Sequence, residues 1–282
     1  MNIIETRSLS YIYSQGTSFE KKAVDNINIT VAKGEIVAIV GHTGSGKSTF
    51  VKMINGLIKP TAGEIFIDNK NIWSKEDKIR DIRFKVGLVF QYPEHQLFEE
   101  TVYKDIAFGP TNKGLSKSEV DNCVYDAARF VGLDPNLLNK SPFDISGGER
   151  RRAAIAGVIA MNPDILILDE PTAGLDPRGR RLLMNQILQY HRQKKNTILF
   201  VSHNMEEVSQ IANRVIVMNK GKVEMFDNTK RIFLSEDKLS SIGLEVPPIV
   251  KIMKELKKRG YGVDDTILTV KQAEAEILKL IK

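Results

Sequence analysis

Hydrophobic and polar residues follow two different periods along this chain. Near the start, Ile27, Ile29 and Val31 alternate with polar residues, which predicts a strand with one buried face. Short apolar runs without alternation predict strands that are buried on both faces. The strand-like segments that follow lie at 36–40, 63–72, 86–90, 164–170, 196–203 and 214–226. The Asn219-Lys220-Gly221 turn inside the last segment predicts a hairpin.

A helical period occurs between these strands. From 116 to 133, apolar residues recur at helical spacing, with Ser116 or Ser118 as a possible N-cap. Those apolar residues are Val120, Val124, Ala127, Ala128 and Val131. A further helix is predicted from about Lys47 to Leu57. Strands that alternate with helices predict an α/β fold with a mainly parallel sheet covered on both faces. A helical insertion interrupts it between about 93 and 160.

The pattern weakens after about residue 232. Residues 247–260 open with two prolines and have an amphipathic helical pattern, and a second helical pattern runs over 271–282. We therefore predict a domain over 1–231 and a small C-terminal appendage over 232–282.

Composition excludes some classes of protein but does not identify the function. The 282 residues are 42% hydrophobic and 27% charged, which is ordinary for a soluble globular protein. The net charge of +6 suits an acidic partner such as nucleic acid, nucleotide or an anionic membrane surface. Cys123 is the single cysteine, so a disulfide framework within the chain is excluded.

The sequence shows no targeting or membrane segment. Its first residues lack the apolar core of a signal peptide, and no run approaches the ~20 apolar residues of a membrane span. We therefore expect a cytoplasmic protein that acts at a membrane only through a partner.

Residues 41–49 read GHTGSGKST and lie between a predicted strand and a predicted helix. This is the setting of a phosphate loop, in which glycines let backbone N–H groups turn towards a phosphate. Lys47 can reach the β- and γ-phosphates and Ser48 can supply a hydroxyl ligand to Mg²⁺, whereas His42 fills a variable position. The nucleotide-binding residues predicted here are Gly41, His42, Thr43, Gly44, Ser45, Gly46, Lys47, Ser48 and Thr49.

Two acidic residues end the predicted strand at 164–170. Asp169 is predicted to hold Mg²⁺ through water, and Glu170 is predicted to orient and polarise an attacking water. Together with the phosphate loop, these acids predict a site that hydrolyses a nucleotide with Mg²⁺.

The stretch SPFDISGGERRR at 141–152 contains a second candidate anion cradle. One nucleotide needs one phosphate loop, so a second cradle has a purpose if two chains meet head to tail. In this respect the chain resembles the ATP-binding cassette (ABC) family, whose signature motif is LSGGQ. The resemblance covers about residues 2–230. It rests on motifs in the family's order, namely GHTGSGKST, VFQYPEHQ, DISGGERRR, ILILDEP, AGLD at 173–176 and SHN at 202–204.

This resemblance implies a phosphate-loop NTPase fold with an antiparallel N-terminal β subdomain, and it assigns roles to single residues. Tyr13 stands where the family stacks an aromatic ring on adenine, although Tyr11 is a competing candidate. Gln91 matches the loop glutamine that senses Mg²⁺, and His203 matches the switch histidine at the γ-phosphate. The remaining matches are Ser146, Gly147 and Gly148 of the signature and Asp176 of the loop that communicates across the dimer.

Glu149 departs from the family, which has Gln at the end of the signature. A carboxylate in the first turn of a helix is favourable for the helix dipole, although it lies near a bound polyphosphate. We expect the change to be tolerated, with Arg150, Arg151 and Arg152 offsetting its charge.

The segment 91–115 is similar to the energy-coupling factor transporters, which import vitamins or transition-metal ions such as cobalt. The segment 13–24, with the phosphate loop, is similar to the second of their two ATPase types. That resemblance implies a peripheral subunit on the cytoplasmic face of the membrane, paired with itself or with a sister ATPase. It also implies an integral-membrane T component that contacts the loop after Gln91, a separate S component that binds the solute, and an appendage that helps to hold the dimer.

Two other classes of ABC protein stay open at this point. An ordinary importer ATPase would share the core but not the QLFEETV stretch at 96–102. A soluble nucleic-acid cassette would show ATPase activity stimulated by DNA or RNA; no nucleic-acid partner is expected.

Overall fold

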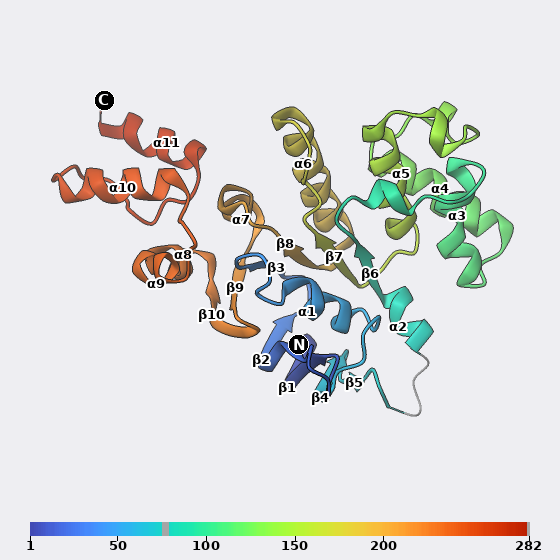
Figure 1. Ribbon diagram of the computed structural model, residues 1–282. Helices are drawn as coiled ribbons and strands as arrows, with labels where there is room; N and C mark the ends of the chain where they lie inside the picture. Colours follow the sequence, from blue (N-terminus) through green and yellow to red (C-terminus); the bar gives the residue numbers. More distant parts are fainter. Residues whose placement is uncertain (75–78, 281–282) are drawn as a thin grey trace.

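Two β-sheets form the body of the molecule (Figure 1), which the computed structural model describes for residues 1–74 and 79–280. The smaller sheet is antiparallel, with the order β2-β1-β4-β5. Its strands are β1 (Asn2–Tyr13), β2 (Lys21–Ala32), β4 (Ala62–Ile67) and β5 (Lys70–Asn71). The larger sheet has the order β10-β9-β3-β8-β7-β6. Its strands are β3 (Ile36–Val40), β6 (Val86–Val89), β7 (Ile165–Asp169), β8 (Thr197–Val201), β9 (Arg214–Asn219) and β10 (Lys222–Asn228).

The strands from β9 to β6 in the larger sheet run parallel, and β10 is antiparallel to β9. The predicted hairpin is therefore present, and Lys220 and Gly221 at its turn have positive φ angles of 47° and 81°. The α/β fold with a mainly parallel sheet and an antiparallel N-terminal subdomain is confirmed.

The alternation of side chains sorts each central strand onto two faces. Val37 and Ile39 of β3 pack with the smaller sheet and α1 (Lys47–Ile54). Ala38 and Val40 pack on the opposite face with helices from the end of the chain. Because both faces are covered, every residue of β3, β7 and β8 is buried, which explains their continuous apolar sequence.

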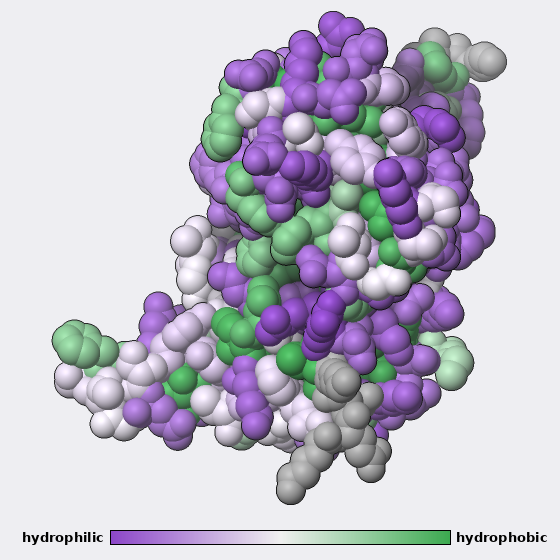
Figure 2. Space-filling view, turned by 90° about the vertical axis from the view of Figure 1, so that its right-hand side faces the viewer, coloured by the Kyte–Doolittle hydropathy of each residue, from purple (hydrophilic) through white to green (hydrophobic). Residues whose placement is uncertain are grey.

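The predicted helical insertion is present between β6 and β7, at the upper right of Figure 1, and Figure 2 views the molecule from that side. Ser116 caps α4 in a capping box with Glu119, as one of the two predicted caps. The insertion consists of η1 (Pro93–Gln96), α3 (Val102–Asn112), α4 (Lys117–Phe130), η2 (Pro135–Leu137), η3 (Pro142–Asp144) and α5 (Gly147–Ile159). The other helices described within 1–74 and 79–211 are α1, α2 (Ile79–Lys85), α6 (Pro177–Lys194) and α7 (Met205–Ile211).

The helix after the phosphate loop is three residues shorter than predicted. α1 ends at Ile54, and Asn55 is its C-cap. The Asn55 side chain donates a hydrogen bond to the carbonyl oxygen of Val86, and Gly56 has a φ of 74°. This left-handed residue stops the helix before Leu57.

Residues 229–280 form four helices. These are α8 (Thr229–Leu234), α9 (Glu236–Ser241), α10 (Pro248–Lys258) and α11 (Val270–Leu280). Ile232, Phe233 and Leu239 of the first two share a core with β9, so the proposed domain boundary at 231/232 falls inside α8. α10 and α11 meet around Met253 and Ala273. None of the helices within 1–74 and 79–280 has the length and apolar character needed to span a membrane.

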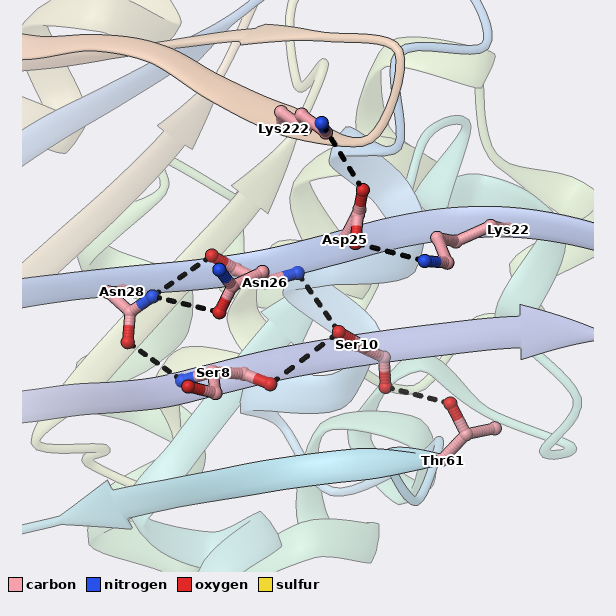
Figure 3. Close-up of polar contacts among 8 residues, drawn as sticks. All are labelled: Ser8, Ser10, Lys22, Asp25, Asn26, Asn28, Thr61 and Lys222. Carbon is pink, nitrogen blue, oxygen red and sulfur yellow. Dashed lines mark hydrogen bonds and ion pairs between the residues drawn. The ribbon is translucent and has the colours of Figure 1, made fainter.

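Polar side chains stabilise an irregular stretch of the smaller sheet (Figure 3). The pairing of β1 with β2 changes register twice between residues 6 and 11. There the N–H of Ser8 donates to Oδ1 of Asn28 at 2.7 Å, and the N–H of Asn26 donates to Oγ of Ser10 at 2.9 Å. These side chains accept from backbone donors that lie at the irregularity, as is common at β-bulges. The end of β1 beyond the bulge carries Tyr13 to the phosphate loop.

Candidate nucleotide site

The predicted site residues follow four neighbouring strands of the larger sheet. β3, β8, β7 and β6 are parallel and adjacent, so their carboxyl ends meet at one edge. The phosphate loop follows β3, His203 follows β8, Asp169 and Glu170 come at the end of β7, and Gln91 follows β6. Ligands of open parallel sheets bind outside this edge. The topology therefore brings these residues to one place.

The phosphate loop passes so close to other backbone that two of its positions require glycine. Gly41 and Gly46 have positive φ angles of 154° and 104°. A Cβ at Gly41 would lie 2.3 Å from the carbonyl oxygen of Met218, and a Cβ at Gly46 would lie 2.3 Å from that of Ala23. Gly46 is the N-cap of α1 and offers no side-chain cap. The N–H groups in the first turn of α1 are therefore open to an anion.

Lys47 is buried within the loop. Its Nζ donates to the carbonyl oxygens of Gly41 at 2.8 Å and His42 at 3.0 Å. Burial lowers the pKa of Lys47, and the negative charges of Glu170 and Asp169 oppose this effect. The loop thus holds an ammonium group beside an open helix N-terminus, and both attract phosphate.

Two other residues of the phosphate loop, His42 and Ser45, differ in their contacts. The imidazole of His42 contacts the carbonyl oxygen of Thr43 through Nδ1 at 2.8 Å and Oδ1 of Asn219 through Nε2 at 2.9 Å. His42 therefore ties the loop to the end of β9. The Ser45 hydroxyl is buried and has no hydrogen-bond partner among the residues that the structure describes.

Asp169 lies nearly buried at the end of β7, with 6% of its surface exposed. Burial raises the pKa of its carboxyl, while a hydrogen bond from the Ser48 hydroxyl lowers it. A carboxylate and a hydroxyl are hard oxygen donors, and here they lie together beside the phosphate loop.

Glu170 is held on both sides. Its Oε2 accepts a hydrogen bond from Nε2 of Gln91 at 3.0 Å, and its Oε1 lies 3.3 Å from Nδ1 of His203. Its backbone N–H donates to the carbonyl oxygen of Val201 at 3.0 Å, and its φ is 49°, which is uncommon for a residue with a side chain. These contacts orient a carboxylate that can polarise a water molecule.

Lys47 lines two cavities. One, of about 250 Å³, is also lined by Tyr13, Lys21 and the start of α1. The other, of about 1000 Å³, is also lined by Gly41, His42, Thr43, Glu170, His203 and the segment 243–251. An extended ligand across the loop would therefore have an aromatic ring at one end and a carboxylate at the other.

Tyr13 and Tyr11 differ in their surroundings. Tyr13 is 38% exposed, and its hydroxyl lies 3.1 Å from Oγ1 of Thr49. Tyr11 is half-buried against the core of the smaller sheet, and the two rings meet edge to face with centroids 4.7 Å apart. Of the two candidates, Tyr13 is the ring that borders the smaller cavity.

Comparison with known proteins agrees with this geometry. Residues 24–173 match the protein family described as ABC transporter. The chain belongs to the ABC transporter family. It is 49% identical over 279 residues to the "Energy-coupling factor transporter ATP-binding protein EcfA2" of Caldanaerobacter subterraneus subsp. tengcongensis, a match that covers 99% of this chain and 98% of that protein.

Two solved structures extend the comparison to the fold. The structure of cbiO1 from Clostridium perfringens, described as part of the ABC transporter complex cbiONQ, is 37% identical. Its TM-score is 0.75, and the match covers 90% of this chain and 99% of that chain. A dimeric structure of the ATP-binding cassette MJ0796 bound to ADP and Pi is 29% identical. Its TM-score is 0.72, and the match covers 80% of this chain and 98% of that chain. The chain is thus an ABC ATPase, in which ATP hydrolysis is coupled to transport.

The residues that match the ABC signature lie at the start of α5. Ser146 is the N-cap, and its Oγ accepts from the N–H of Glu149 at 3.3 Å, while Oε2 of Glu149 accepts from the N–H of Ser146 at 2.7 Å. This reciprocal capping box takes Glu or Gln at its last position. The hydrogen bonds from Ser146 lower the pKa of Glu149, so the carboxylate is charged at neutral pH.

The three arginines after Glu149 do not act alike. The charge of Arg152 lowers the pKa of Glu149, as does that of Lys140. Arg151 instead forms a buried ion pair with Glu94. The expectation that all three arginines offset the charge of Glu149 is therefore wrong for Arg151, because a closer carboxylate takes its guanidinium.

The signature and Asp176 lie apart from the phosphate loop. Asp176 is the N-cap of α6 and accepts from the N–H of Gly179 at 2.6 Å. Within residues 1–74 and 79–280, the lining of the two cavities beside Lys47 includes neither Asp176 nor the signature residues Ser146, Gly147 and Gly148.

Glu207 is a buried residue that the sequence did not single out. Its Oε2 accepts from Oγ1 of Thr172 at 2.9 Å and from Oγ of Ser202 at 3.1 Å. It therefore joins the loop after Glu170 to the residue before His203. A glutamate in the first turn of α7 reads as a partner of the helix dipole, so its sequence position gave no signal.

An apolar groove lies beside the segment that follows Gln91. Figure 2 shows hydrophobic residues, in green, around a hollow about halfway up this side of the molecule. The groove has a volume of about 550 Å³ and is lined by Asn55 and Leu57, which follow α1, and by residues of α2, β6, the segment 96–98, α3 and α5. Phe98 and Phe108 in its lining are 62% and 48% exposed, and their rings meet edge to face at 5.0 Å. Exposed aromatic rings around a hollow are typical of a partner surface.

Asp105 places a carboxyl group in the lining of this groove. One oxygen, Oδ1, accepts from the N–H groups of Phe98 at 3.1 Å and Glu99 at 3.3 Å. The other, Oδ2, is buried and has no partner among the described residues. Burial raises the pKa of Asp105. The sequence did not single out this residue, because an acid in the first turn of a helix is common.

Substitution of Glu149 separates its two effects. Glu149→Gln keeps an acceptor for the N–H of Ser146, so we expect an unchanged free energy of unfolding and ATPase activity within about twofold of wild type. Glu149→Ala removes half of the capping box and should lower the free energy of unfolding by about 1 kcal/mol. Urea denaturation checks both; an equal loss in the two variants would contradict the capping role.

Substitution of Asp105 tests the buried carboxylate. Because its pKa is raised above the unfolded value of 3.8, the folded protein loses stability as the pH rises through the folded pKa. Asp105→Asn should therefore melt at a higher temperature than wild type at pH 7.5, with a smaller gap at pH 5. Asp105→Ala also leaves two N–H groups without an acceptor and should cost about 1–3 kcal/mol. An Asn variant that is less stable at pH 7.5 would argue against a destabilising charge.

Proposed function

We propose that this chain is the ATPase subunit of an energy-coupling factor importer, in which ATP closes two cassettes head to tail and hydrolysis reopens them. The observation that carries the proposal is the meeting of the phosphate loop, Gln91, Glu170 and His203 at one sheet edge, beside an apolar groove. The name of the relative that is 49% identical over the full length of the chain supports the same assignment.

ATP would lie across the phosphate loop with its base on Tyr13. The N–H groups of the loop and of the first turn of α1 would bind the phosphates, and Lys47 would exchange its bonds to loop carbonyls for bonds to the β- and γ-phosphates. The loop residues in this role are Gly41, His42, Thr43, Gly44, Ser45, Gly46, Lys47, Ser48 and Thr49.

Ser48, Asp169 and Gln91 would hold Mg²⁺. Mg²⁺ takes oxygen ligands and binds through one or two side chains together with phosphate oxygens and water. The hydroxyl of Ser48 and the carboxyl of Asp169 lie together, and the described residues contain no group of three or more His, Cys, Asp or Glu side chains that could hold a metal. This sparse donor set suits an ion that arrives with a nucleotide. When bound, Mg²⁺ would neutralise charge on the phosphates.

Glu170 would act as the general base. Its carboxylate would take the proton of a water whose oxygen bonds to the γ-phosphorus while the bond from that phosphorus to the β-phosphate oxygen breaks. Gln91 and His203 hold the two carboxylate oxygens in place. The imidazole of His203 is 71% exposed, so it is free to contact the γ-phosphate.

Ser146, Gly147 and Gly148 would serve the nucleotide of the facing cassette. They lie at the exposed N-terminus of α5, outside the cavities beside their own phosphate loop. Asp176, at the N-cap of α6, would contact the facing cassette as well. The second cassette is another copy of this chain or a sister ATPase.

The groove would receive helices of the integral-membrane T component. Its exposed aromatic rings offer apolar contact, and the unpaired oxygen of Asp105 offers a bond to a basic side chain. A separate S component would bind the transported solute, a vitamin or a transition-metal ion. The chain would thus sit as a peripheral subunit on the cytoplasmic face of the membrane.

The division into a cassette over 1–231, with a helical subdomain over about 93–160, and an extension over 232–282 belongs to the same proposal. The last two helices expose apolar side chains that a second extension could cover. These are Ile252 of α10 and Val270, Leu278 and Leu280 of α11. We infer that the extension helps to hold the dimer.

Two variants separate nucleotide binding from hydrolysis. Glu170→Gln removes the base but no phosphate ligand, so we expect kcat to fall about 100-fold or more, with an ATP-dependent dimer on size-exclusion chromatography. Lys47→Ala should weaken ATP binding about tenfold or more and give no such dimer. Near-normal turnover by Glu170→Gln would rule out this residue as the base.

Affinity purification from native membranes tests the importer assignment. The wild-type chain should co-purify with a polytopic T component, a small S component and a second cassette. Phe98→Ser should recover about tenfold less T component, since a central aromatic contact is worth more than ~1 kcal/mol. Tyr125→Ser, at a 49% exposed ring of α4 outside the groove lining, is the matched control. Recovery of no membrane protein with wild type would reject the assignment.

A further inference from the structure

Arg151, in the second turn of α5, joins three parts of the chain. Its side chain is 6% exposed. Nε and Nη2 donate to Oε2 and Oε1 of Glu94, both at 2.9 Å, as a bidentate pair. Nη1 donates to the carbonyl oxygen of Ala173 at 2.7 Å and to that of Pro171 at 3.5 Å. From one position on the signature helix, the guanidinium thus contacts both η1 and the loop between β7 and α6.

The pair is charged although it is largely buried. The side chain of Glu94 is 17% exposed. Burial raises the pKa of Glu94, but the hydrogen bonds and charge of Arg151 outweigh this effect, and the pKa lies below its ordinary value. Desolvation of two charges is costly, so a buried pair adds little net stability even when every donor is used. Its best-attested use is to fix one arrangement of the groups around it.

The joined segments belong to two different active sites in the proposed dimer. η1 begins two residues after Gln91, and Ala173 comes three residues after Glu170. Gln91 and Glu170 are themselves hydrogen-bonded at 3.0 Å. α5 begins at the signature, which would serve the nucleotide of the facing cassette.

We propose that Arg151 is a positioning residue, which holds the signature of one active site in a fixed position relative to the Gln91–Glu170 pair of the other. Glu94 is its counter-ion. This inference rests on the proposed function, because only a head-to-tail dimer gives the signature a nucleotide to serve. Arginine suits the task, since its planar group donates in several directions at once, whereas a lysine cannot pair bidentately with Glu94 and also reach Ala173 in the same geometry.

The Arg151–Glu94 pair also lies next to the groove. Gln96 and Leu97, at the end of η1, line the groove, as does Ala154, about one turn after Arg151 on the same helix. A partner helix that shifts η1 therefore shifts Glu94 and, through Arg151, the signature helix. The T component thereby gains a route to the nucleotide of the facing cassette that does not pass through Gln91.

The test measures ATP hydrolysis by the complex purified from native membranes. Arg151→Lys and Glu94→Gln keep most of the side-chain volume and disrupt the bidentate pair. We expect kcat to fall about tenfold in each, with KM for ATP within about twofold of wild type, because the phosphate loop is untouched. The double variant should be no slower than the slower single variant, since both remove the same link. Arg129→Lys, in an exposed pair with Asp126 on α4, is the matched control and should keep the wild-type kcat.

The Hill coefficient for ATP distinguishes positioning from loss of folded protein. Unfolding lowers the amount of active complex without changing how rate depends on ATP concentration. A loosened link between two sites lowers the Hill coefficient towards one. Wild-type kcat and Hill coefficient in Arg151→Lys would overturn the inference alone. So would a loss of kcat that equals the loss of folded complex with an unchanged Hill coefficient. An inactive wild-type complex would instead overturn the proposed function, and this inference with it.

Discussion

Four short parallel strands, hydrogen-bonded in the order β3-β8-β7-β6, hold the nucleotide site together because their carboxyl ends leave the sheet along one edge. The strands are buried on both faces, so the edge cannot shift without exposing apolar surface to water. Each strand then needs only one or two polar residues at its end to build the site. The close approach of the phosphate loop to the carbonyl oxygens of Met218 and Ala23 depends on this same frame, and it explains the glycines at 41 and 46.

Several charged groups are buried around this frame at a cost in stability. Burial lowers the pKa of Lys47 and raises those of Asp169 and Asp105, so each prefers its neutral form more than it would in water. Each lies where a ligand or partner of opposite charge is proposed to bind. Groups with shifted pKa values cluster at functional sites, because a bound ligand or partner provides the opposite charge that the folded chain alone does not place beside them.

The loop between β7 and α6 is braced from two sides. Glu207 holds it through the hydroxyl of Thr172, towards the strand that leads to His203. Arg151 holds it through the carbonyl oxygen of Ala173, towards η1 and the signature helix. Since the groove is lined by residues of η1 and α5, a partner bound there acts on the same braced unit. The hydrogen bonds of Arg151 therefore connect segments that line the groove to the loop that follows Glu170.

Most of the architecture could be predicted from local patterns. Continuous apolar runs predicted the buried strands, and the glycines and Lys47 predicted the phosphate loop. Asp169 and Glu170 were predicted as site residues because they come at the end of a predicted strand. These features are local, because a few consecutive residues carry both the structure and the chemistry. The predicted end of α1 was wrong by three residues, because Gly56 takes a left-handed conformation that stops the helix, and the Asn55 side chain before it bonds to Val86, far away in the sequence.

The tertiary structure decided the contacts between residues that lie far apart in the sequence. Arg151, two residues after Glu149, was expected to offset the charge of Glu149, but it binds Glu94, which lies 57 residues earlier. The charges that lower the pKa of Glu149 are those of Arg152 and Lys140. Tyr13 borders the cavity beside the phosphate loop, while Tyr11 is half-buried against the core of the smaller sheet. Asp105 and Glu207 have the sequence position of ordinary acids in the first turn of a helix. In the structure, Glu207 is hydrogen-bonded to Thr172, whereas one carboxyl oxygen of Asp105 is buried without a partner among the described residues. The sequence alone determined the fold class and the motifs of the site, because these depend on residues that are close together in the sequence. The tertiary structure decided which charges pair, because pairing depends on burial and distance in space.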